Sequence, residues 1–427
     1  MGMNNAIASS YMKSLNKCYT SFPPSPSPPV PPSIIRSKHL NSISSRSGVA
    51  RIYGFCCAVF QGVSIGRTAA LTLFWAAIAI APVSAAVDLR VSVKQGVNGL
   101  AVGGSTAAKV RDETGQQVGT IPAGDAYTAR SGGGNVRVGN WQGRQLWVEP
   151  EGQGAVWIGD RWYRGDVRLV PQSGGLAAIN HVDLEEYLYS VVGAEAIASW
   201  PLEALKAQAV AARSYALYKR AESPNDLYDV GTTTATQVYK GLESEASSTV
   251  QAVRETAGEV VVYGGQVALT AYHSSSGGHT ENVEDVWSSP LPYLRGVPDY
   301  DQNAPVYQWS LFFSTADLSR RLGGVGTIRQ MTPERTTPRG RVVAMAVVGD
   351  GGTTRVTGAQ VQRALGLRSR LFSVTATGSG FQVQGRGFGH GVGMSQWGAK
   401  AMADRGLSYR QILGHYYQNA GLSRLGE

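Results

Sequence analysis

Cysteine is scarce in this chain and confined to its beginning. The only three cysteines, Cys18, Cys56 and Cys57, lie within the first 86 residues. A mature protein that starts near residue 87 would therefore contain no disulfide, no thiolate metal ligand and no cysteine nucleophile. Its stability must come from packing.

Acidic residues are absent from the same segment. Residues 1–86 contain seven Lys and Arg residues but no Asp or Glu, so they carry seven of the nine net positive charges of the chain. Residues 87–427 are left with a net charge of only +2. Because nucleic-acid binding requires clustered Lys and Arg side chains, this nearly neutral part is not expected to bind nucleic acid.

A long hydrophobic run is also lacking. The apolar stretch at 69–81, which follows Arg67, is shorter than the roughly 20 residues that a transmembrane helix needs. Val83, Ser84 and Ala85 then give the small-residue spacing of a signal-peptidase site. We predict a signal peptide over 67–86 and export to the periplasm or cell envelope. The alternative is an uncleaved membrane anchor, which would be the only membrane contact of the protein.

The segment before this signal is rich in serine and proline. Residues 1–66 include the run PPSPSPPVPPS at 23–33, and we predict a disordered leader there. Its acid-free composition fits either a start codon placed too early or an organelle transit peptide ahead of a bacterial-type signal. The second case would place the protein in the wall space of a plastid-type organelle.

The remaining chain has the pattern of an α+β protein. Its high glycine content, 53 residues in all, favours tight turns between strands over a helical bundle. Short alternating segments predict several β-strands over 87–170, and residues 171–427 mix helical and strand patterns around a β-rich core with packed helices. Beyond residue 240 we expect helices at 245–257, 315–324, 358–366, 395–406 and 408–420, and strands at 260–265, 267–276, 342–349 and 381–387.

One carboxylate stands out near the middle of the chain. Glu195 lies in a mainly apolar stretch from Tyr187 to Ile197, which offers little solvation to an ionised carboxylate, so its pKa is expected to be unusual. Pro201 suits the first turn of a helix whose apolar residues recur with a period of 3.6. Lys206 and Arg213 are seven positions apart on one flank of that helix, where they could reach a cleft or only water.

The same stretch resembles a known family signature. Residues 184–216 contain LEEYL, then VV, two further residues and a Glu, and then PLEALKAQAVAARSYA, which is similar to the pattern of the SpoIID/LytB family. The resemblance implies a SpoIID-like catalytic region over 171–427. SpoIID-type members are lytic transglycosylases that cut peptidoglycan glycan strands, and the Glu of the pattern, here Glu195, is their catalytic acid.

A second signature lies near the end of the chain. In GRGFGHGVGMSQWGAKAMA, at 385–403, glycines alternate around His390, which allows backbone N–H groups to approach a ligand closely. The spacing is not that of a dinucleotide-binding loop, and no P-loop occurs. GHGVGMSQ also matches the family, which implies that His390, Ser395 and Gln396 lie near the glycan cleft. A purely structural glycine corner is the alternative.

A third signature, AYHSSSGGHTENVEDVW at 271–287, leaves several alternatives open. His273, His279 and Asp285 are spaced six and six apart, and two imidazoles with a carboxylate can form an open zinc site. Hydrogen-bonded loop histidines are the simpler interpretation, so we expect no cofactor. A serine nucleophile beside His273 lacks a third orienting group.

The remaining substrate-binding candidates follow from the resemblance. Gln237 and Tyr239 match the family's QVYKG and could present an amide and a phenol to sugar hydroxyls, or simply anchor a core tyrosine. The full set of expected substrate-binding residues is Lys206, Gln208, Arg213, Gln237, Tyr239, His273, Ser274, His390, Ser395 and Gln396.

These observations lead to one mechanism and one alternative. Glycosidases usually need two carboxylates, but a lytic transglycosylase can use one, because the 6-hydroxyl of N-acetylmuramic acid is the nucleophile. Glu195, protonated at rest, would be that general acid and base. The alternative is a non-enzymatic wall-binding protein that acts with a cell-wall amidase, since LytB-type members are amidase enhancers.

Overall fold

The computed structural model describes residues 87–223, 227–287 and 289–426. The predicted leader at 1–66 and the signal or anchor at 67–86 lie outside these residues. Among the described helices, none combines the length and the apolar character that crossing a bilayer requires.

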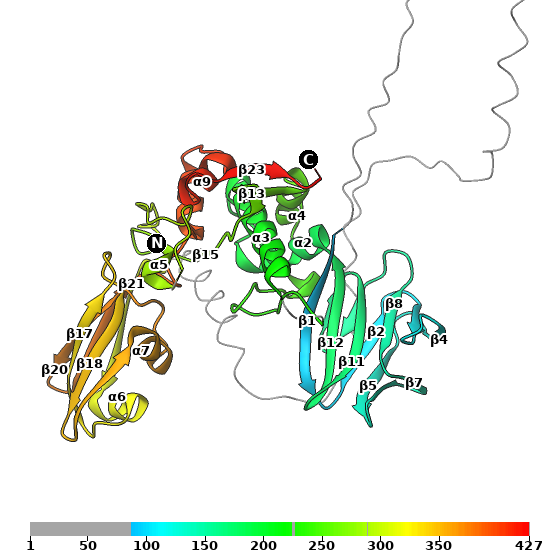
Figure 1. Ribbon diagram of the computed structural model, residues 1–427, viewed down its shortest axis with the longest axis horizontal. Coiled ribbons are helices and arrows are strands. Elements are labelled where there is room, and N and C mark those ends of the chain that lie inside the picture. Colours follow the sequence, from blue (N-terminus) through cyan, green and yellow to red (C-terminus); the bar gives the residue numbers. More distant parts are fainter. Residues whose placement is uncertain (1–86, 224–226, 288, 427) are drawn as a thin grey trace, which may run out of the picture. The chain divides into compact units, whose positions relative to one another are not determined.

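Two antiparallel six-stranded sheets form the first part of the described chain (Figure 1). Along these strands, buried residues are separated by more exposed ones: on β1, Leu89 and Val91 are buried on either side of the more exposed Arg90. The inward side chains of both sheets share one core. The expected β-rich region is therefore confirmed, and its strands continue beyond residue 170 to Asp183. The first sheet runs β1 (Asp88–Val97), β12 (Gly175–Asp183), β11 (Asp166–Gln172), β8 (Leu146–Pro150), β3 (Ala108–Arg111) and β4 (Gln117–Ile121). The second runs β10 (Arg161–Tyr163), β9 (Val156–Ile158), β2 (Leu100–Gly104), β5 (Ala126–Gly132), β6 (Asn135–Val138) and β7 (Trp141–Gly143).

Helix α2 (Leu184–Glu195) begins where β12 ends. Asp183 caps it by accepting hydrogen bonds from the backbone N–H groups of Glu185 and Glu186. Helix α3 (Leu202–Glu222) starts after Pro201, as expected, and packs against α2 and α4 (Ser247–Glu255). The short 3-10 helix η2 (Gly241–Ser244) precedes α4.

Alanines allow α3 to be buried on two sides. Ala209, Ala212 and Ala216 belong to the core of the two large sheets, whereas Ala207 and Ala211 belong to a second core. The second core also packs α8 (Gln396–Asp404) and α9 (Tyr409–Tyr416), which confirms both expected C-terminal helices. Its strands are β13 (Glu259–Tyr263), β14 (Gln266–Val267) and β23 (Gly421–Arg424) in one sheet, and the parallel pair β15 (Tyr272–His273) and β22 (Met394–Ser395).

One expected strand, at 267–276, is wrong as a continuous element. Only β14 and β15 form there. Between and after them the chain binds other segments: the Thr270 hydroxyl donates to the carbonyl of Ala211, and Ser275 exchanges two backbone hydrogen bonds with Phe388. The single turn of helix α5 (Val283–Val286) follows.

Residues 308–386 form a further pair of three-stranded sheets with their own core. One sheet has the order β16 (Gln308–Ser314), β21 (Gly380–Arg386), β20 (Phe372–Thr377), and the other β17 (Ile328–Thr336), β18 (Val342–Gly349), β19 (Gly352–Thr357). Helices α6 (Thr315–Leu322) and α7 (Gly358–Leu365) pack against these strands around Leu318, Met345 and Val361 (Figure 1). The helices expected at 315–324 and 358–366 and the strand at 342–349 are thus confirmed, and with them the α+β class.

Candidate functional site

Glu195 is the last residue of α2, and its carboxyl is held by a neighbouring loop. Oε1 accepts a hydrogen bond of 2.8 Å from the backbone N–H of Val238. Burial raises the pKa of Glu195 above its ordinary value, and the Val238 N–H, the Gln396 side chain and the charge of Lys240 act in the opposite direction. The residue as a whole keeps some exposed surface while the carboxyl is densely surrounded by protein atoms. Burial therefore favours the protonated form of this carboxyl.

Three tyrosines lie near this carboxyl. Their pKa values are raised, first by burial and second by the negative charge of Glu195; they are Tyr187, Tyr215 and Tyr272. The Gln237 side chain connects two of them, because it accepts from the Tyr187 hydroxyl (3.1 Å) and donates to that of Tyr272 (3.0 Å). These phenols therefore stay neutral, and the polar groups beside Glu195 that they provide are uncharged.

The QVYKG segment therefore acts differently from the expectation. Gln237 is completely buried and also donates to the carbonyl of Ala212, so it is not available to a sugar. Tyr239 is buried too, and its hydroxyl donates to Asn180 over 2.7 Å. The prediction that both contact substrate is wrong. What the segment contributes is the Val238 N–H, whose role no side-chain pattern reveals.

The C-terminal signature is brought directly to Glu195. Gln396, at the start of α8, donates from Nε2 to the backbone carbonyl of Glu195 (3.1 Å) and to Oε1 of Gln208 on α3 (3.3 Å). The Nε2 group of Gln208 is buried and has no hydrogen-bond partner within the described residues. Segments 201 positions apart thus meet at one carboxylic acid.

The two α3 cations that the sequence singled out, Lys206 and Arg213, do not bind Glu195. Arg213 is fully buried and forms a two-pronged ion pair with Glu185, with N–O distances of 2.7 and 2.6 Å. Lys206 pairs with Glu203 (3.0 Å) and Glu255 (2.6 Å). Arg213 is therefore a structural residue, which corrects its predicted contact with substrate, and Lys206 is held by two carboxylates.

His390 lies beside His273, with ring centroids 5.2 Å apart. Nδ1 of His390 accepts from the Val392 N–H and Nε2 donates to the carbonyl of Tyr272 over 3.0 Å, which assigns a neutral ring. Burial and the charge of Arg341 lower the pKa of His390 to about 4. Tyr272 thereby links the two halves of the site: its carbonyl binds His390 and its hydroxyl binds Gln237.

The candidate zinc ligands are not assembled. Within the ranges that the structure describes, no three His, Cys, Asp or Glu side chains lie close enough together to hold a metal ion. His273 turns toward His390, the Nδ1 atom of His279 lies 2.6 Å from the carbonyl of Thr280, and Asp285 accepts from Asn282. The six-residue spacing fails because Gly277 and Gly278, with φ of 79° and 106°, turn the loop between the histidines.

The serines have structural partners. Ser275 and Ser276 donate to the buried Asp301 and Asp299 over 2.5 and 2.6 Å. Ser395 is fully buried and caps α8 by accepting from the Gly398 N–H, so its predicted substrate contact is wrong. Ser274 keeps some exposed surface, and its carbonyl accepts from the Trp397 N–H.

A buried cluster that no sequence pattern predicted supports the His390 loop. Arg341 donates to the carbonyl of Ser276 (2.6 Å), and its Nε lies 3.5 Å from Oε1 of Glu281. Thr337 donates to the same Glu281 oxygen over 2.6 Å. These contacts tie the turn between β17 and β18 to the loop that follows β15. The pairing joins residues 56 positions apart, so only the fold could reveal it.

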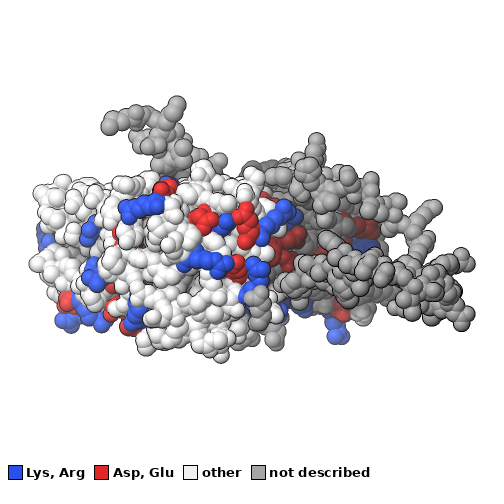
Figure 2. All heavy atoms as spheres, turned by 90° about the horizontal axis from the view of Figure 1, so that it is seen from above, with Lys and Arg blue, Asp and Glu red and all other residues white. Residues whose placement is uncertain are grey.

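Charge is evenly distributed on the visible surface. Figure 2 shows Lys and Arg interspersed with Asp and Glu on the face that it draws, without a large area of one sign. This agrees with the near-neutral charge of residues 87–427 and gives no support to phosphate-backbone binding.

Comparison with known proteins gives two family matches and several relatives. Residues 172–263 match the family described as stage II sporulation protein, and residues 299–393 match a domain of unknown function. The chain is 35% identical over 267 residues to stage II sporulation protein D of Bacillus subtilis, covering 58% of this chain and 76% of that protein. It is 35% identical over 265 residues to an uncharacterised protein of Brachyspira hyodysenteriae, covering 61% and 72%. It is also 32% identical over 294 residues to the amidase enhancer of Bacillus subtilis, covering 55% of this chain and 40% of the enhancer.

Proposed function

Since the chain belongs to the SpoIID family, we propose that it is a lytic transglycosylase that cleaves the glycan strands of peptidoglycan with Glu195 as general acid and base. A role at the cell wall follows from the family, and it accords with the expected export of the protein to the cell envelope. The observation that carries the proposal is the setting of Glu195: a buried carboxyl with a raised pKa, on a residue that keeps some exposed surface, where three distant segments meet.

The mechanism needs only this one acid. Glu195 donates its proton to the leaving oxygen as the bond from that oxygen to C1 of N-acetylmuramic acid breaks. The carboxylate then accepts the proton of the 6-hydroxyl, whose oxygen bonds to C1 and closes the 1,6-anhydro ring. The raised pKa suits the first step, and the Val238 N–H suits the carboxylate that the first step creates.

The surroundings favour this route over ordinary hydrolysis. Hydrolysis requires a second carboxylate flanking the scissile bond. No acidic group is among the causes that shift the pKa of Glu195. Glu185, which lies in the first turn of the same helix, is bound to Arg213. The substrate's own hydroxyl is therefore the better nucleophile.

Replacing Glu195 by Gln tests the proposal. Formation of 1,6-anhydro ends from purified glycan strands should be abolished, because the amide cannot donate a proton of suitable acidity. The fold should be retained, since the amide oxygen can still accept from Val238. The readout is mass spectrometry of the products with thermal unfolding alongside. Glu186→Gln on the same helix is the matched control and should retain activity; full turnover by Glu195→Gln would overturn the assignment.

The amidase-enhancer relative favours a second candidate, a wall-binding protein without activity of its own. Glu195 would then be structural. Incubation of the protein with glycan strands that lack stem peptides separates the two: new anhydro ends indicate the enzyme, and co-sedimentation without cleavage indicates the binder. If the protein binds without cleaving, a cell-wall amidase is added to the mixture, and an increase in the rate of the amidase shows that the protein is an enhancer.

A further inference from the structure

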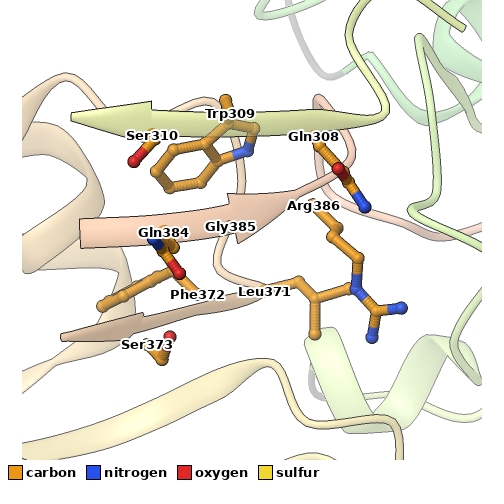
Figure 3. Close-up of a pocket in the computed structure, with 9 residues that line it drawn as sticks. All are labelled: Gln308, Trp309, Ser310, Leu371, Phe372, Ser373, Gln384, Gly385 and Arg386. Atoms are coloured by element: carbon orange, nitrogen blue, oxygen red, sulfur yellow. The ribbon is translucent and has the colours of Figure 1, made fainter. Parts of the chain in front are cut away.

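A hollow lies over one face of the sheet β16–β21–β20, away from the residues that surround Glu195. Its volume is about 710 Å³, and nine residues line it: Gln308, Trp309, Ser310, Leu371, Phe372, Ser373, Gln384, Gly385 and Arg386 (Figure 3). None of them is among the expected catalytic or substrate-binding residues, although Gly385 and Arg386 begin the second family signature. The hollow lies within the part of the chain that matches a domain of unknown function.

Strand register places the polar lining on one face of the sheet. Gln308 pairs with Arg386, and Ser310 pairs with Gln384, which in turn pairs with Ser373. These five side chains are exposed, whereas the alternating residues Trp309 and Phe372 are buried in the core behind them. Figure 3 shows Gln308 and Arg386 at one end of the hollow and the two serines with Gln384 at the other.

The charge of the hollow is positive and uncompensated. None of its nine lining residues is acidic. The exposed Arg386 forms no ion pair or side-chain hydrogen bond with any residue that the structure describes, in contrast to Arg329 and Arg355, which are paired on the neighbouring sheet. An anionic group of a ligand would find an unoccupied guanidinium here.

The same face also presents an aromatic ring. Phe312 pairs with Gln382 two rows beyond Ser310 and Gln384, and its side chain is 52% exposed. From Gln308 to Phe312 the face extends for about 14 Å, at about 3.4 Å per residue. Phe312 is the only large apolar side chain exposed on this face of β16, so the surface lacks the apolar centre that is typical of protein interfaces.

We propose that this face is a second binding surface for glycan strands without stem peptides, with Arg386 binding the free lactyl carboxylate of a muramic acid residue. The amides and hydroxyls match sugar hydroxyls and acetamido groups, and Phe312 offers a flat surface to a sugar ring. Strand β21 leads from Arg386 directly into the loop that carries His390, four residues later. A glycan strand bound on this sheet would thereby be attached to the same segment of the chain as the His390 loop.

The inference rests on the proposed cell-wall substrate, and binding measurements test it separately from cleavage. The full chain carrying Glu195→Gln is titrated into fluorescently labelled glycan strands freed of stem peptides. Adding Arg386→Gln should weaken binding about tenfold, which corresponds to the loss of about 1.4 kcal/mol. Arg363→Gln removes an exposed arginine on α7 of the same region and should leave binding unchanged.

Two further arms identify the ligand group. Chito-oligosaccharides of the same length lack the carboxylate and should bind the Arg386→Gln and Arg363→Gln proteins equally. Phe312→Ala should weaken binding of both polymers. All these positions are exposed, so the variants should fold, and thermal unfolding checks this.

The outcomes separate this inference from the proposed function. Equal affinity of the Arg386→Gln and Arg363→Gln proteins for the strands overturns the second surface, even if the unmodified protein forms anhydro ends. Binding that depends on Arg386, together with an unmodified protein that forms no anhydro ends, supports the surface and overturns the enzymatic proposal.

Discussion

Glu195 combines two requirements that oppose each other at the scale of a single residue. A proton donor must be protonated near neutral pH, which calls for burial, yet it must reach a substrate, which calls for exposure. Under the proposed function Glu195 would have to meet both: its carboxyl is buried between the Val238 backbone and the Gln396 side chain, and the residue, at the end of α2, keeps some exposed surface. Arg213, the cation that the sequence placed nearby, is bound elsewhere and does not depress the pKa of Glu195.

The raised pKa of Glu195 predicts how stability depends on pH. A carboxyl whose pKa is higher in the folded protein stabilises the fold fully below its unfolded value of about 4.5, and this contribution is lost as pH rises through the folded-state pKa. Glu195→Gln removes the titration. The difference in melting temperature between variant and unmodified protein should be near zero at pH 4 and should increase in favour of the variant up to pH 8.

Thermal unfolding of both proteins over this pH range measures the effect. Glu255→Gln is the contrasting control, because hydrogen bonds from Lys206 and Gln251 lower the pKa of Glu255, so that this variant should become relatively less stable as pH rises. A Glu195→Gln protein that becomes relatively less stable with rising pH would contradict a raised pKa at Glu195.

At the scale of an element, the glycine-rich segment between β21 and β22 depends on close backbone approach. Gly391 has a φ of 84°, and a Cβ added there would lie 2.3 Å from the guanidinium of Arg341. Glu281 accepts a hydrogen bond from Thr337 and donates its own backbone N–H to the Gly391 carbonyl over 2.8 Å. The glycine therefore allows the buried arginine to lie against the His390 loop, which is a packing role and not a ligand-binding one.

Two alanine substitutions separate this contact from backbone strain. Gly406 has nearly the same φ, 85°, but open space around its Cβ position. Gly406→Ala should cost about 1 kcal/mol of unfolding free energy from backbone strain alone. Gly391→Ala should cost about 1–3 kcal/mol more, because Arg341 is displaced. Urea unfolding measures both, and equal costs would contradict the close contact.

At the scale of the whole molecule, packing and ordinary hydrogen bonds hold the described chain together. Residues 87–427 contain no cysteine, and the described part contains no cluster of three metal-ligating side chains. The three largest hydrophobic cores contain most of the buried apolar side chains. One lies between the two large sheets, one around α8 and α9, and one within residues 308–386. Helix α3 contributes side chains to the first two and so couples them.

This composition predicts indifference to chelator and reductant. Formation of anhydro ends and the melting temperature should both be unchanged by an excess of EDTA or of dithiothreitol. Product analysis and thermal unfolding with and without each reagent check this. Loss of activity with EDTA, restored by zinc, would instead support a metal site at His273 and His279.

The sequence by itself determined the α+β class, most helices and the family, because hydrophobic period, capping residues and a long family signature are local properties of the chain. Only the tertiary structure decided that Gln237, Tyr239, Arg213 and Ser395 are buried structural residues, since local pattern cannot distinguish a polar side chain that faces a cleft from one with a partner in the interior. The same limit hid the Val238 N–H, the Arg341 cluster and the polar face around Arg386. Each of these depends on segments far apart in the chain, which meet only when the cores pack.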